Sequence, residues 1–421
     1  MEKNKKKTII FLMSRLPFPA VSGRKKSLYH YCRILSEELG FRLVVAAFPE
    51  KNDIPENPPG FIDRLVILPE ASNGRKILSV IKDSLILQKY PMQVALFWNT
   101  GAKKVVDELF REEQPIAVIA DMIRTTEYIK DLPVKRIADL DDRISLRFKR
   151  QMNIAMDNLN PYGAYLQRLP AILRKILLSC PIKCNIIRKE IALLEKYEKE
   201  ICLDCDYTVF VAASEAEEIN RELGVKKAMA IPIGVDTEYF FRKTRKTEKD
   251  VIGFLGALNV THNESAVKLF IEKIFPKIKT VLPDVKFWVI GGGITENLIK
   301  YASDDVNFVG RVDDVRDYLE KCSVFVCPMQ FGSGVKTKIL EAMAMEIPVV
   351  TSSIGAENIG AINGKDWIIE NDPKKFANQV CDLLKNPDKR ETMGRNGRAF
   401  VKQNWNWNIA KKKFKKILEV N

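Results

Sequence analysis

The sequence predicts an α/β protein of two domains, each a parallel sheet covered by helices. Apolar runs of strand length alternate with stretches of helix length, which is the pattern of parallel sheets wrapped by helices. The alternation stops at a charged connector, "YFFRKTRKTEKD", and then restarts. The chain of 421 residues is also longer than one hydrophobic core usually serves. We therefore expect one domain on each side of this connector.

The first domain is expected over residues 1–240. Five apolar runs indicate its strands: "TIIFLM", "RLVVAAF", "RLVILP", "PIAVIAD" and "VKRIADLDD". A helix, "LYHYCRILSEELG", follows the first of these runs. The alternation resumes later with a strand from Asp206 to Ala212 and a helix in the acidic run after Ser214, and "AMAIPIGVD" closes the domain.

A helical segment interrupts the first domain between about residues 144 and 203. Prolines break it, and Ile191, Leu194, Tyr197 and Ile201 are spaced as one face of a helix. Residues 143–200 hold 12 Lys or Arg against five acids. This surplus of seven positive charges is half of the net charge of +14. Two interpretations stay open: peripheral contact with acidic lipid, or a solvated helical insertion.

The second domain is expected over residues 248–400. It repeats a strand, turn and helix unit in "VIGFLGALNVTHNESAVKLFIEKIF", "VKFWVIGGGI", "VNFVGRVDDVRDYLEKC" and "SVFVCPMQFGSGVKTKILEAMAM". Residues 401–421 are expected to form a C-terminal helix that packs back on the first domain. Because ligands of parallel sheets bind beyond the carboxyl ends of the strands, a cleft between the domains is the expected active site.

Composition restricts the partners. The net charge of +14 favours an anionic partner: a nucleotide, nucleic acid or an acidic membrane. No apolar run is long enough to span a bilayer, and Thr8 to Met13 is too short for the core of a signal peptide. We therefore expect a cytoplasmic protein, with the inner face of the cell membrane as an alternative location.

Eight cysteines are too few for a disulfide scaffold. Cys180, Cys184, Cys202 and Cys205 come near the spacing of a zinc ribbon. However, the first pair has three intervening residues and lies in the apolar stretch "ILLSCPIKCNII", where buried thiols are ordinary. We favour buried thiols over zinc.

The stretch "FGSGVKTKILEAM" resembles a phosphate-binding loop. It is not an ATPase P-loop, because Gln330 and Val335 stand where that motif requires glycines. A strand nevertheless leads into Gly332 to Gly334, and a helix is expected to begin near Lys336. Small residues before a helix start favour an anion, which the lysines would also attract.

Lys338 and Glu341 follow on the same expected helix, one turn apart. A carboxylate there would repel phosphate but suits sugar hydroxyls, so together with the loop it indicates a nucleotide. The alternative is a tight turn before a capped helix with a solvated Glu341, because a glycine loop alone is weak support.

The segment "GSGVKTKILEAMAMEIPVVTSSIGAENI", preceded by "VNFVGRVDDVRDYLEKCSVFVCP", resembles the C-terminal domain of family-4 retaining glycosyltransferases. These enzymes have the GT-B fold, in which two Rossmann-like domains face a cleft. The resemblance is specific from about Val251 to Phe400. "SRLPFPAVSGRKKSLYHYCRILSEEL" is similar to the family's first glycine loop, and "RIADLDDRIS", "EKYEKEICLDCDYTVFVAASEAEEI" and "IPIGVD" are similar to the subgroup that builds bacterial surface polysaccharides.

The resemblance implies roles for the second domain. Glu341 would bind the nucleotide ribose, and Gly332 to Gly334 would present amides to the diphosphate and sugar of the donor. Lys338 matches a lysine common in the subgroup and is a better phosphate ligand than Lys336.

Further roles follow from the same resemblance. Val309 to Val312, a segment that includes Gly310 and Arg311, would lie beside the base, and Gly256 would lie on the turn facing the cleft. In the first domain, Gly23 would let the loop close over the phosphates, with Arg24 adjacent.

The sequence also departs from the family pattern. Ser333 stands eight positions before Glu341, where the family has a first glutamate, and "GALNVTHNES" lacks the usual arginine and lysine after the first strand of the second domain. Lys336 and Lys338 must therefore supply more of the charge that binds phosphate.

A retaining transfer places negative charge on the departing diphosphate, so its stabilisation is the main catalytic demand. No dedicated base is required, which suits a chain in which we expect structural roles for the two histidines. Asp121 is a candidate for sugar or acceptor contact, although such strand-end acids also cap helices. Asp139, Asp141 and Asp142 invite a metal interpretation, but GT-B enzymes generally do not depend on a bound metal. We expect no metal and no other cofactor.

The predicted function is a retaining hexosyltransferase-like enzyme that moves a sugar from a UDP- or GDP-sugar to a glycan or polyprenyl-linked acceptor in cell-surface polysaccharide synthesis. Two alternatives remain. A nucleotide-sugar epimerase with the same architecture would need catalytic acids and histidines that are scarce here. A nucleic-acid-binding protein would explain the charge, but no helix-turn-helix and no aromatic-rich basic strands are visible, so we expect no nucleic-acid partner.

Overall fold

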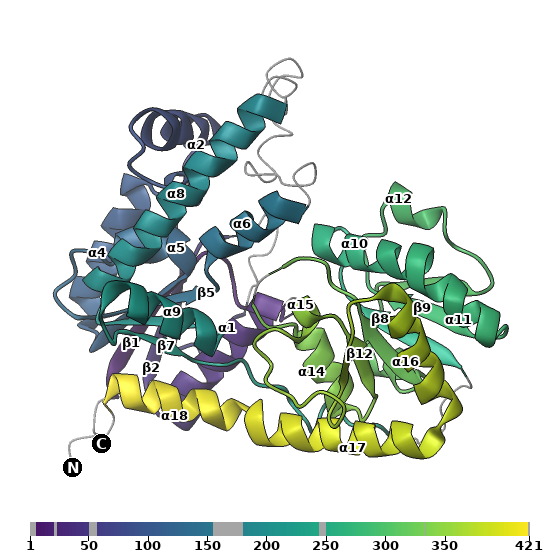
Figure 1. The fold of residues 1–421 in the computed structure, drawn as a ribbon. Helices are drawn as coiled ribbons and strands as arrows, with labels where there is room; N and C mark the ends of the chain where they lie inside the picture. The colour runs from purple at the N-terminus through teal and green to yellow at the C-terminus, as the bar shows by residue number, and fades with distance from the viewer. Residues whose placement is uncertain are drawn as a thin grey trace, which may run out of the picture. The chain divides into compact units, whose positions relative to one another are not determined.

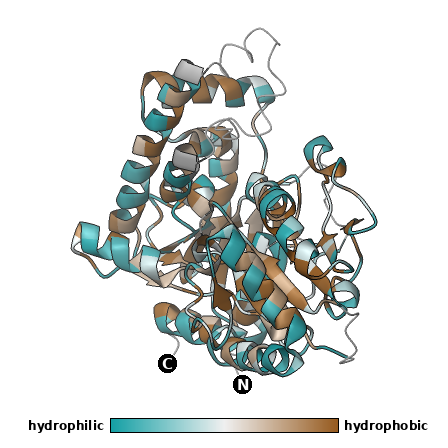
Figure 2. Cartoon of the chain, turned by 45° about the vertical axis from the view of Figure 1, so that its right-hand side comes forward, coloured by the Kyte–Doolittle hydropathy of each residue, from teal (hydrophilic) through white to brown (hydrophobic). Residues whose placement is uncertain are grey.

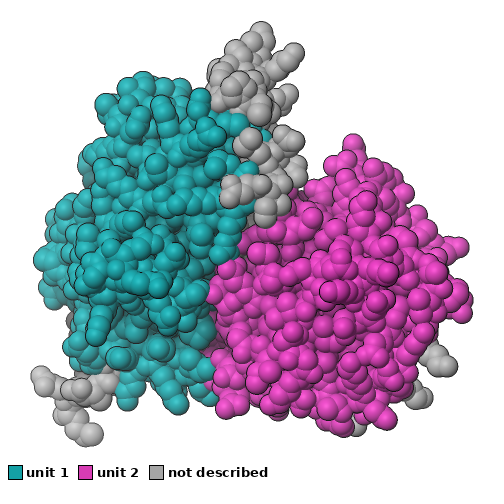
Figure 3. Space-filling model, viewed as in Figure 1, with its two compact units in different colours: residues 1–232, 408–421 teal, residues 233–407 magenta. Residues whose placement is uncertain are grey.

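The computed structural model describes residues 6–20, 23–49, 57–154, 180–243, 250–332 and 334–419. The chain forms two compact units, shown in Figure 3. Unit 1 contains residues 1–232 and 408–421, and unit 2 contains residues 233–407. The first unit thus ends before the expected boundary at residue 240, and the last residues of the chain return to it.

Unit 1 contains a seven-stranded sheet in the order β3-β2-β1-β4-β5-β6-β7, in which every described pair of strands is parallel. The order reverses direction between β1 and β4, which makes their carboxyl ends the switch point of the sheet. The strands are β1 (Thr8–Met13), β2 (Arg42–Ala47), β3 (Arg64–Ile67), β4 (Ala117–Asp121), β5 (Lys135–Asp141), β6 (Tyr207–Phe210) and β7 (Ala228–Ala230).

Unit 2 contains a six-stranded sheet in the order β10-β9-β8-β11-β12-β13, again parallel throughout its described pairs. Its direction reverses between β8 and β11. The strands are β8 (Val251–Leu255), β9 (Lys286–Ile290), β10 (Val306–Gly310), β11 (Val324–Cys327), β12 (Val349–Thr351) and β13 (Ile368–Ile369). Each unit is a Rossmann-like α/β domain, as the alternation of runs predicted.

Helices surround both sheets (Figure 1). In unit 1 they are α1 (Gly23–Arg33), α2 (Asn73–Ser79), α3 (Met92–Phe97), α4 (Thr100–Glu113), α5 (Met122–Thr125), α6 (Ile144–Ile154), α8 (Cys180–Asp204), α9 (Ala213–Leu223) and α18 (Trp407–Leu418), with the π-helical segments η1 (Ile34–Glu38) and η2 (Val80–Ile86) and the 3-10 turn η3 (Thr126–Tyr128). In unit 2 they are α10 (Thr261–Leu269), the π-helical η6 (Phe270–Ile274), α11 (Phe275–Val281), α12 (Glu296–Ile299), α13 (Arg316–Leu319), α14 (Thr337–Ala344), α15 (Ser353–Ala356), α16 (Pro373–Lys385) and α17 (Pro387–Asn404).

The central strands are buried on both faces. All six residues of β1 and all five of β8 are buried. This explains why the strands are continuous apolar runs without alternation, since helices cover each side of a parallel sheet. Figure 2 shows the strands mainly in brown and the helices with teal and brown faces. Burial of these runs is the main stabilising contribution to both units.

The helical segment of unit 1 includes α6 and α8. Ile191, Leu194, Tyr197 and Ile201 are all buried, so the expected apolar face of α8 packs inward. Residues 155–179, which include the expected breaks at Pro161 and Pro170, lie outside the described residues. None of the described helices is both long enough and apolar enough to cross a membrane.

The C-terminal helix α18 packs on unit 1. The rings of Phe414 and Tyr31 lie 5.0 Å apart, centroid to centroid, in an edge-on contact. Lys135 Nζ donates a hydrogen bond to the carbonyl oxygen of Ile417 at 3.1 Å. The apolar residues Ala410, Phe414, Ile417 and Leu418 are buried, and lysines occupy positions 411–413, 415 and 416 of this amphipathic helix.

Candidate functional site

The switch point of unit 2 brings together the turns after β8, β9 and β10. The N–H of Gly256 donates to Ile290 O at 2.9 Å, and the N–H of Gly291 donates to Gly310 O at 2.9 Å. Gly291 has φ +140°, and a Cβ built on it would lie 2.1 Å from Gly256 O. The strand ends therefore meet backbone to backbone, with no space for a side chain. Two predicted site residues, Gly256 and Gly310, belong to this junction.

Lys338 projects from the first turn of α14 toward the same junction. Its Nζ donates a hydrogen bond to Asn263 Oδ1 and lies 4.6 Å from the centroid of the Phe254 ring. A Cβ on Gly256 would lie 2.7 Å from Lys338 Nζ. The structure thus places the predicted residues Gly256 and Lys338 against each other, and glycine is required for the lysine to reach this position.

The ammonium of Lys338 keeps its charge. Among the residues that the structure describes, it forms no ion pair, and its two contacts are a neutral amide and an aromatic ring. Burial is the main reason that the pKa of Lys338 falls to about 8; Cys327 and Glu341 raise it, whereas Lys336 lowers it. An ammonium has three N–H donors, so an anion could accept the remaining bonds and restore the pKa.

Lys336 points elsewhere. It is the residue before α14 and is buried, and its Nζ donates to Gly334 O at 2.9 Å. Gly332 and Gly334 have φ values of +141° and +63°, in the region that favours glycine. Lys336 therefore stabilises its own loop, and Lys338 is the lysine directed at the strand ends. Ser333 lies outside the described residues.

Glu341 lies one turn beyond Lys338 on α14 and is buried, at 7% exposure. Across the sheet, Gly310 ends β10 with φ +82°, followed by an exposed Arg311 and a half-buried Val312. A Cβ built on Gly292 would lie 3.3 Å from Arg311 Cβ, so the turn after β9 lies next to the turn after β10. The residues expected beside the base thus follow the strand that neighbours β9.

Side chains that the sequence did not single out support the loop after β11. Ser352 Oγ donates to Met329 O at 2.6 Å, and Thr351 Oγ1 donates to Cys327 O at 2.9 Å. Ser265 Oγ donates to Gln330 Oε1 at 2.5 Å. These bonds come from the turn after β12 and from α10, and they fix the course of the loop that carries the glycines. Small hydroxyl residues at strand ends give no distinctive pattern in a single sequence.

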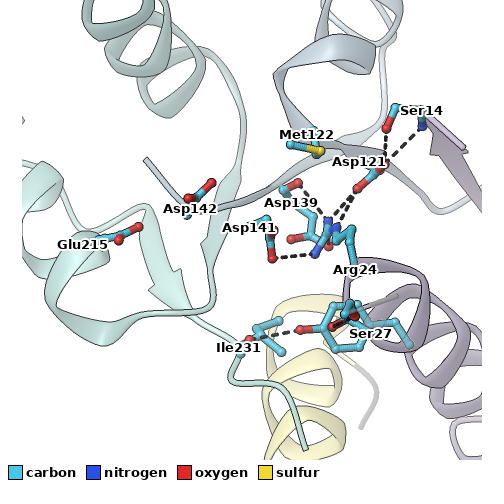
Figure 4. A network of polar contacts seen from close by, with 12 residues as sticks. Ser14, Arg24, Ser27, Asp121, Met122, Asp139, Asp141, Asp142, Glu215 and Ile231 are labelled. Atoms are coloured by element: carbon cyan, nitrogen blue, oxygen red, sulfur yellow. Dashed lines mark hydrogen bonds and ion pairs between the residues drawn. The ribbon is translucent and has the colours of Figure 1, made fainter. Parts of the chain in front are cut away.

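The switch point of unit 1 holds a buried ion-pair network (Figure 4). Arg24, on the first turn of α1, lies 2.6 Å from Asp121 Oδ1, 2.8 Å from Asp139 Oδ2 and 3.2 Å from Asp141 Oδ1. The backbone N–H and the hydroxyl of Ser14 both donate to Asp121 Oδ2, at 3.1 and 2.7 Å. Both oxygens of Asp121 are thus occupied by partners within unit 1.

One guanidinium faces three carboxylates in this network, and their pKa values diverge. Although burial opposes it, Arg24 and Ser14 together lower the pKa of Asp121. The pKa of Asp139 is raised to about 6, chiefly by burial; Arg24 opposes the rise, and Asp121 and Asp141 contribute to it. The pKa of Asp141 is also raised, chiefly by burial.

The backbone at this switch point is unusual. Met122, which follows β4, has a φ of +58°, and Asp141, which ends β5, has a φ of +68°. Such values cost energy for residues other than glycine and are often found at functional sites. Gly23 begins α1 beside Arg24 and is exposed, with open space where a Cβ would lie. The structure thus brings the predicted residues Arg24 and Asp121 together. At position 23, a side chain would meet no neighbouring atom, so the local packing does not require glycine.

Among the described residues, no three His, Cys, Asp or Glu side chains are grouped so that they could hold a metal ion. Asp141 contacts Arg24, whereas Asp142 accepts a hydrogen bond from Arg147 at 3.1 Å, so the two neighbouring acids have different partners. Cys202 and Cys205 are buried thiols. The side chain of Cys180 lies outside the described residues.

Comparison with known proteins relates unit 2 to a family. Residues 249–386, about a third of the chain, match the family model "Glycosyl transferases group 1". An uncharacterized 44.6 kDa protein in the cps region of Klebsiella pneumoniae is 27% identical over 233 residues, covering 53% of this chain and 58% of the relative. The GDP-mannose-dependent monoacylated alpha-(1-6)-phosphatidylinositol monomannoside mannosyltransferase of Corynebacterium glutamicum is 25% identical over 210 residues, covering 45% and 55%.

A third relative, a capsular polysaccharide biosynthesis glycosyltransferase of Staphylococcus aureus, is 30% identical over 135 residues, covering 30% of this chain and 35% of the relative. The chain spans little more than half the length of the first two of these relatives. The matches are therefore partial, and they do not by themselves assign the activity of the whole protein.

Solved structures match the fold over nearly the whole chain. The sucrose-phosphate synthase of Thermosynechococcus elongatus has a TM-score of 0.67 at 14% identity, covering 98% of each chain. Anabaena HepE, solved in complex with UDP and glucose, has a TM-score of 0.62 at 12% identity, covering 98% of this chain and 99% of that one. These likenesses show the fold, a GT-B fold of two Rossmann-like domains, and within it residues 249–386 resemble glycosyl transferases group 1.

Proposed function

We propose that the protein is a retaining glycosyltransferase of family 4, which transfers a sugar from a UDP- or GDP-sugar to a glycan or polyprenyl-linked acceptor during cell-surface polysaccharide synthesis. The observation that carries this proposal is Lys338: a charged ammonium without an acidic partner among the described residues, at the switch point of unit 2. An anionic ligand is the natural complement of such a group. The family match over the same residues makes a sugar nucleotide the best candidate.

The donor would be bound by groups from several strand ends. Lys338 and the amides of the loop from Gly332 to Gly334 would hold the diphosphate, and Glu341 would accept hydrogen bonds from ribose hydroxyls. Arg311 and Val312 would border the base. The Corynebacterium relative is named for GDP-mannose and the Anabaena structure contains UDP, so both nucleotides are candidates.

Catalysis would depend on stabilising the departing diphosphate. Negative charge grows on its oxygens as the sugar–oxygen bond breaks, and a fixed ammonium with oriented N–H groups lowers the energy of that state. The leaving phosphate can take the proton of the acceptor hydroxyl, so Lys338 must stay protonated throughout. No separate cofactor is needed for this scheme.

Unit 1 would supply the acceptor side. Arg24 and Asp121 connect the beginning of α1 to the ends of β1, β4 and β5, and this fixes the two ends of the glycine loop between Ser14 and Gly23. Because both oxygens of Asp121 have partners, we propose that Asp121 and Arg24 position this loop. For Asp121 or Arg24 to contact the sugar or the acceptor directly, one of its existing hydrogen bonds would have to be replaced by a bond to that ligand.

We also propose peripheral contact with acidic lipid, at the inner face of the membrane. Within residues 143–200, two basic side chains have an acidic partner in common, since Arg143 and Lys199 each lie 2.9 Å from Glu222. The segment α2–η2 offers a better surface. Several of its exposed side chains are apolar, among them Leu78 at 64% and Ile86 at 68% exposure.

The pattern of α2–η2 is the reverse of an ordinary surface helix. Lys76 and Ser84 are buried, whereas Leu78, Ile81, Ile86 and Leu87 are exposed. Arg75, Lys82 and Lys89 are exposed around them, which suits an acidic headgroup layer. Sedimentation with phosphatidylglycerol vesicles tests this: Leu78→Ser with Ile86→Ser should lower binding, and no binding of wild type at low salt would refute the lipid contact.

The function is tested by incubating the protein with labelled UDP- and GDP-sugars. Transfer or slow hydrolysis with retained anomeric configuration supports the proposal, whereas interconversion of the sugars would indicate an epimerase. Tight DNA binding without any turnover would indicate a nucleic-acid-binding protein. Thermal shift across the same panel identifies the donor, because a ligand of the folded state raises its melting temperature.

Glu341→Ala tests the site. Loss of the ribose contact should abolish measurable binding of the donor identified in the panel, with Glu391→Ala, an exposed acid on α17, as the matched control. Unchanged affinity for UDP and GDP in Glu341→Ala would refute the assignment of the site.

A further inference from the structure

Asn263 lies between Lys338 and the turn after β8. It is on the first turn of α10 and is 5% exposed. Its Oδ1 accepts the hydrogen bond of Lys338 Nζ, and its Nδ2 donates to Ala257 O at 2.8 Å. If the side-chain amide of Asn263 were turned by 180°, its N–H group would face the ammonium and its oxygen would face the carbonyl of Ala257. These two partners therefore fix the orientation of the amide.

The same amide also borders Gly256. A Cβ on Gly256 would lie 2.9 Å from Asn263 Nδ2 and 2.7 Å from Lys338 Nζ. The glycine, the asparagine and the lysine thus fit together without spare room. Because both ends of the amide are hydrogen-bonded, Asn263 offers the ammonium of Lys338 an acceptor in a fixed position.

A neutral partner has a consequence for charge. A carboxylate at this position would form an ion pair with Lys338 and cancel most of its attraction for a phosphate. The amide oxygen orients the ammonium and leaves its net charge for a ligand. The turn "GALNVTHNES" contains no lysine or arginine, so Lys338 has no cationic substitute there.

We propose that Asn263 is a positioning residue for the donor diphosphate: it holds the ammonium of Lys338 at the strand ends while keeping its charge uncompensated. This inference rests on the proposed function, because it assigns the anion at Lys338 to the diphosphate of the donor. Asn263 acts through Lys338 and needs no contact with the ligand of its own.

The test compares Asn263→Asp with wild type by calorimetric titration of UDP and GDP. The variant keeps the shape and places a carboxylate on Lys338, so affinity for the nucleotide that wild type binds should fall about tenfold or more at pH 7. Asn307→Asp, the same change at an exposed position of β10, is the matched control and should bind like wild type. Thermal unfolding of both variants checks that they fold.

A pH series separates positioning from a merely structural role. In wild type the affinity should decline above about pH 8, where Lys338 of the empty site loses its proton. In Asn263→Asp the carboxylate raises the pKa of Lys338, so the decline should move to higher pH although affinity at pH 7 is lower. Asn263→Ala should weaken binding at every pH.

The outcomes are distinct. If wild type binds neither nucleotide nor any nucleotide sugar, the proposed function fails and the inference fails with it. If wild type binds and folded Asn263→Asp has the same affinity and the same pH profile, the role of Asn263 alone is refuted.

Discussion

The two sheets place a cation at the same topological position and use it in opposite ways. At the switch point of unit 1, Arg24 is surrounded by Asp121, Asp139 and Asp141. At the switch point of unit 2, Lys338 contacts a neutral amide and a ring, with no ion pair among the described residues. The charge of the first cation is neutralised within the fold, and we propose that the second binds an anionic ligand. Strand topology thus determines where a ligand site can form. The partners of the cation at that position determine whether its charge is available to a ligand.

The comparison is tested most strongly by removing each cation. Arg24→Ala would leave two buried carboxylates, Asp121 and Asp139, and the half-buried Asp141 without their shared partner, so the free energy of unfolding should fall by about 3–5 kcal/mol. Lys338→Met removes a charge that has no acidic partner, and it should leave stability within about 1 kcal/mol of wild type. Chemical denaturation measures both.

Arg33→Ala serves as the control for Arg24→Ala. Arg33 lies on the same helix in an exposed pair with Glu37 at 2.9 Å, and its loss should cost at most about 1 kcal/mol. A similarly small cost for Arg24→Ala would mean that the unit 1 network is not structural, and the contrast between the two units would fail.

The pH dependence of unit 1 should reveal the excess of carboxylates. The pKa of Asp139 is raised to about 6 in the folded protein, so the folded state binds a proton between about pH 4 and 6 that the unfolded state does not. Protonation of Asp139 therefore stabilises the fold as the pH falls through 6, by about 2 kcal/mol. Asp121, with a lowered pKa, acts in the opposite sense below that range.

Asp139→Asn isolates this effect. The free energy of unfolding of wild type, measured relative to Asp139→Asn, should rise as the pH falls from about 6 to 4 and stay level above 7. Acids outside the Arg24 network titrate in both proteins and cancel in the difference. A constant difference across this range would contradict the raised pKa of Asp139.

A smaller effect is expected at the edge of the network. Ser14→Ala removes the hydroxyl bond to Asp121 and leaves the backbone N–H bond, so stability should fall by only about 1 kcal/mol. Thermal unfolding is sufficient to measure it. A cost as large as that of Arg24→Ala would place the serine hydroxyl at the centre of the network.

The arrangement of residues at the unit 2 switch point is easier to predict from the sequence than the arrangement at the unit 1 switch point, for a physical reason. Gly256, Gly310 and Lys338 each lie close to a strand-sized run, so local pattern suffices to place them at strand ends. Arg24 and Asp121 are 97 residues apart, and only the parallel pairing of β1 with β4 brings them together. The pairing of β1 with β4 places a carboxylate beside Arg24, and the sequence alone does not reveal that Arg24 has this partner.

Asn263 illustrates the same limit within unit 2. It is 75 residues from Lys338, and in the sequence it is one polar residue in the turn "THNES". The fold itself was predictable because strand alternation and the break at the connector are local signals. The boundary at residues 232 and 233 lies away from the charged connector, since compact packing and not composition determines it.

Calorimetric titration of UDP and GDP into wild type and Lys338→Met tests the central claim most directly. Wild type should bind at least one of the two, and Lys338→Met should lose about tenfold or more in affinity while unfolding at the same denaturant concentration. Lys268→Met, at an exposed position of α10, should bind like wild type. Equal affinity of Lys338→Met and wild type, or no binding of either nucleotide to wild type, would contradict a diphosphate site at the switch point of unit 2.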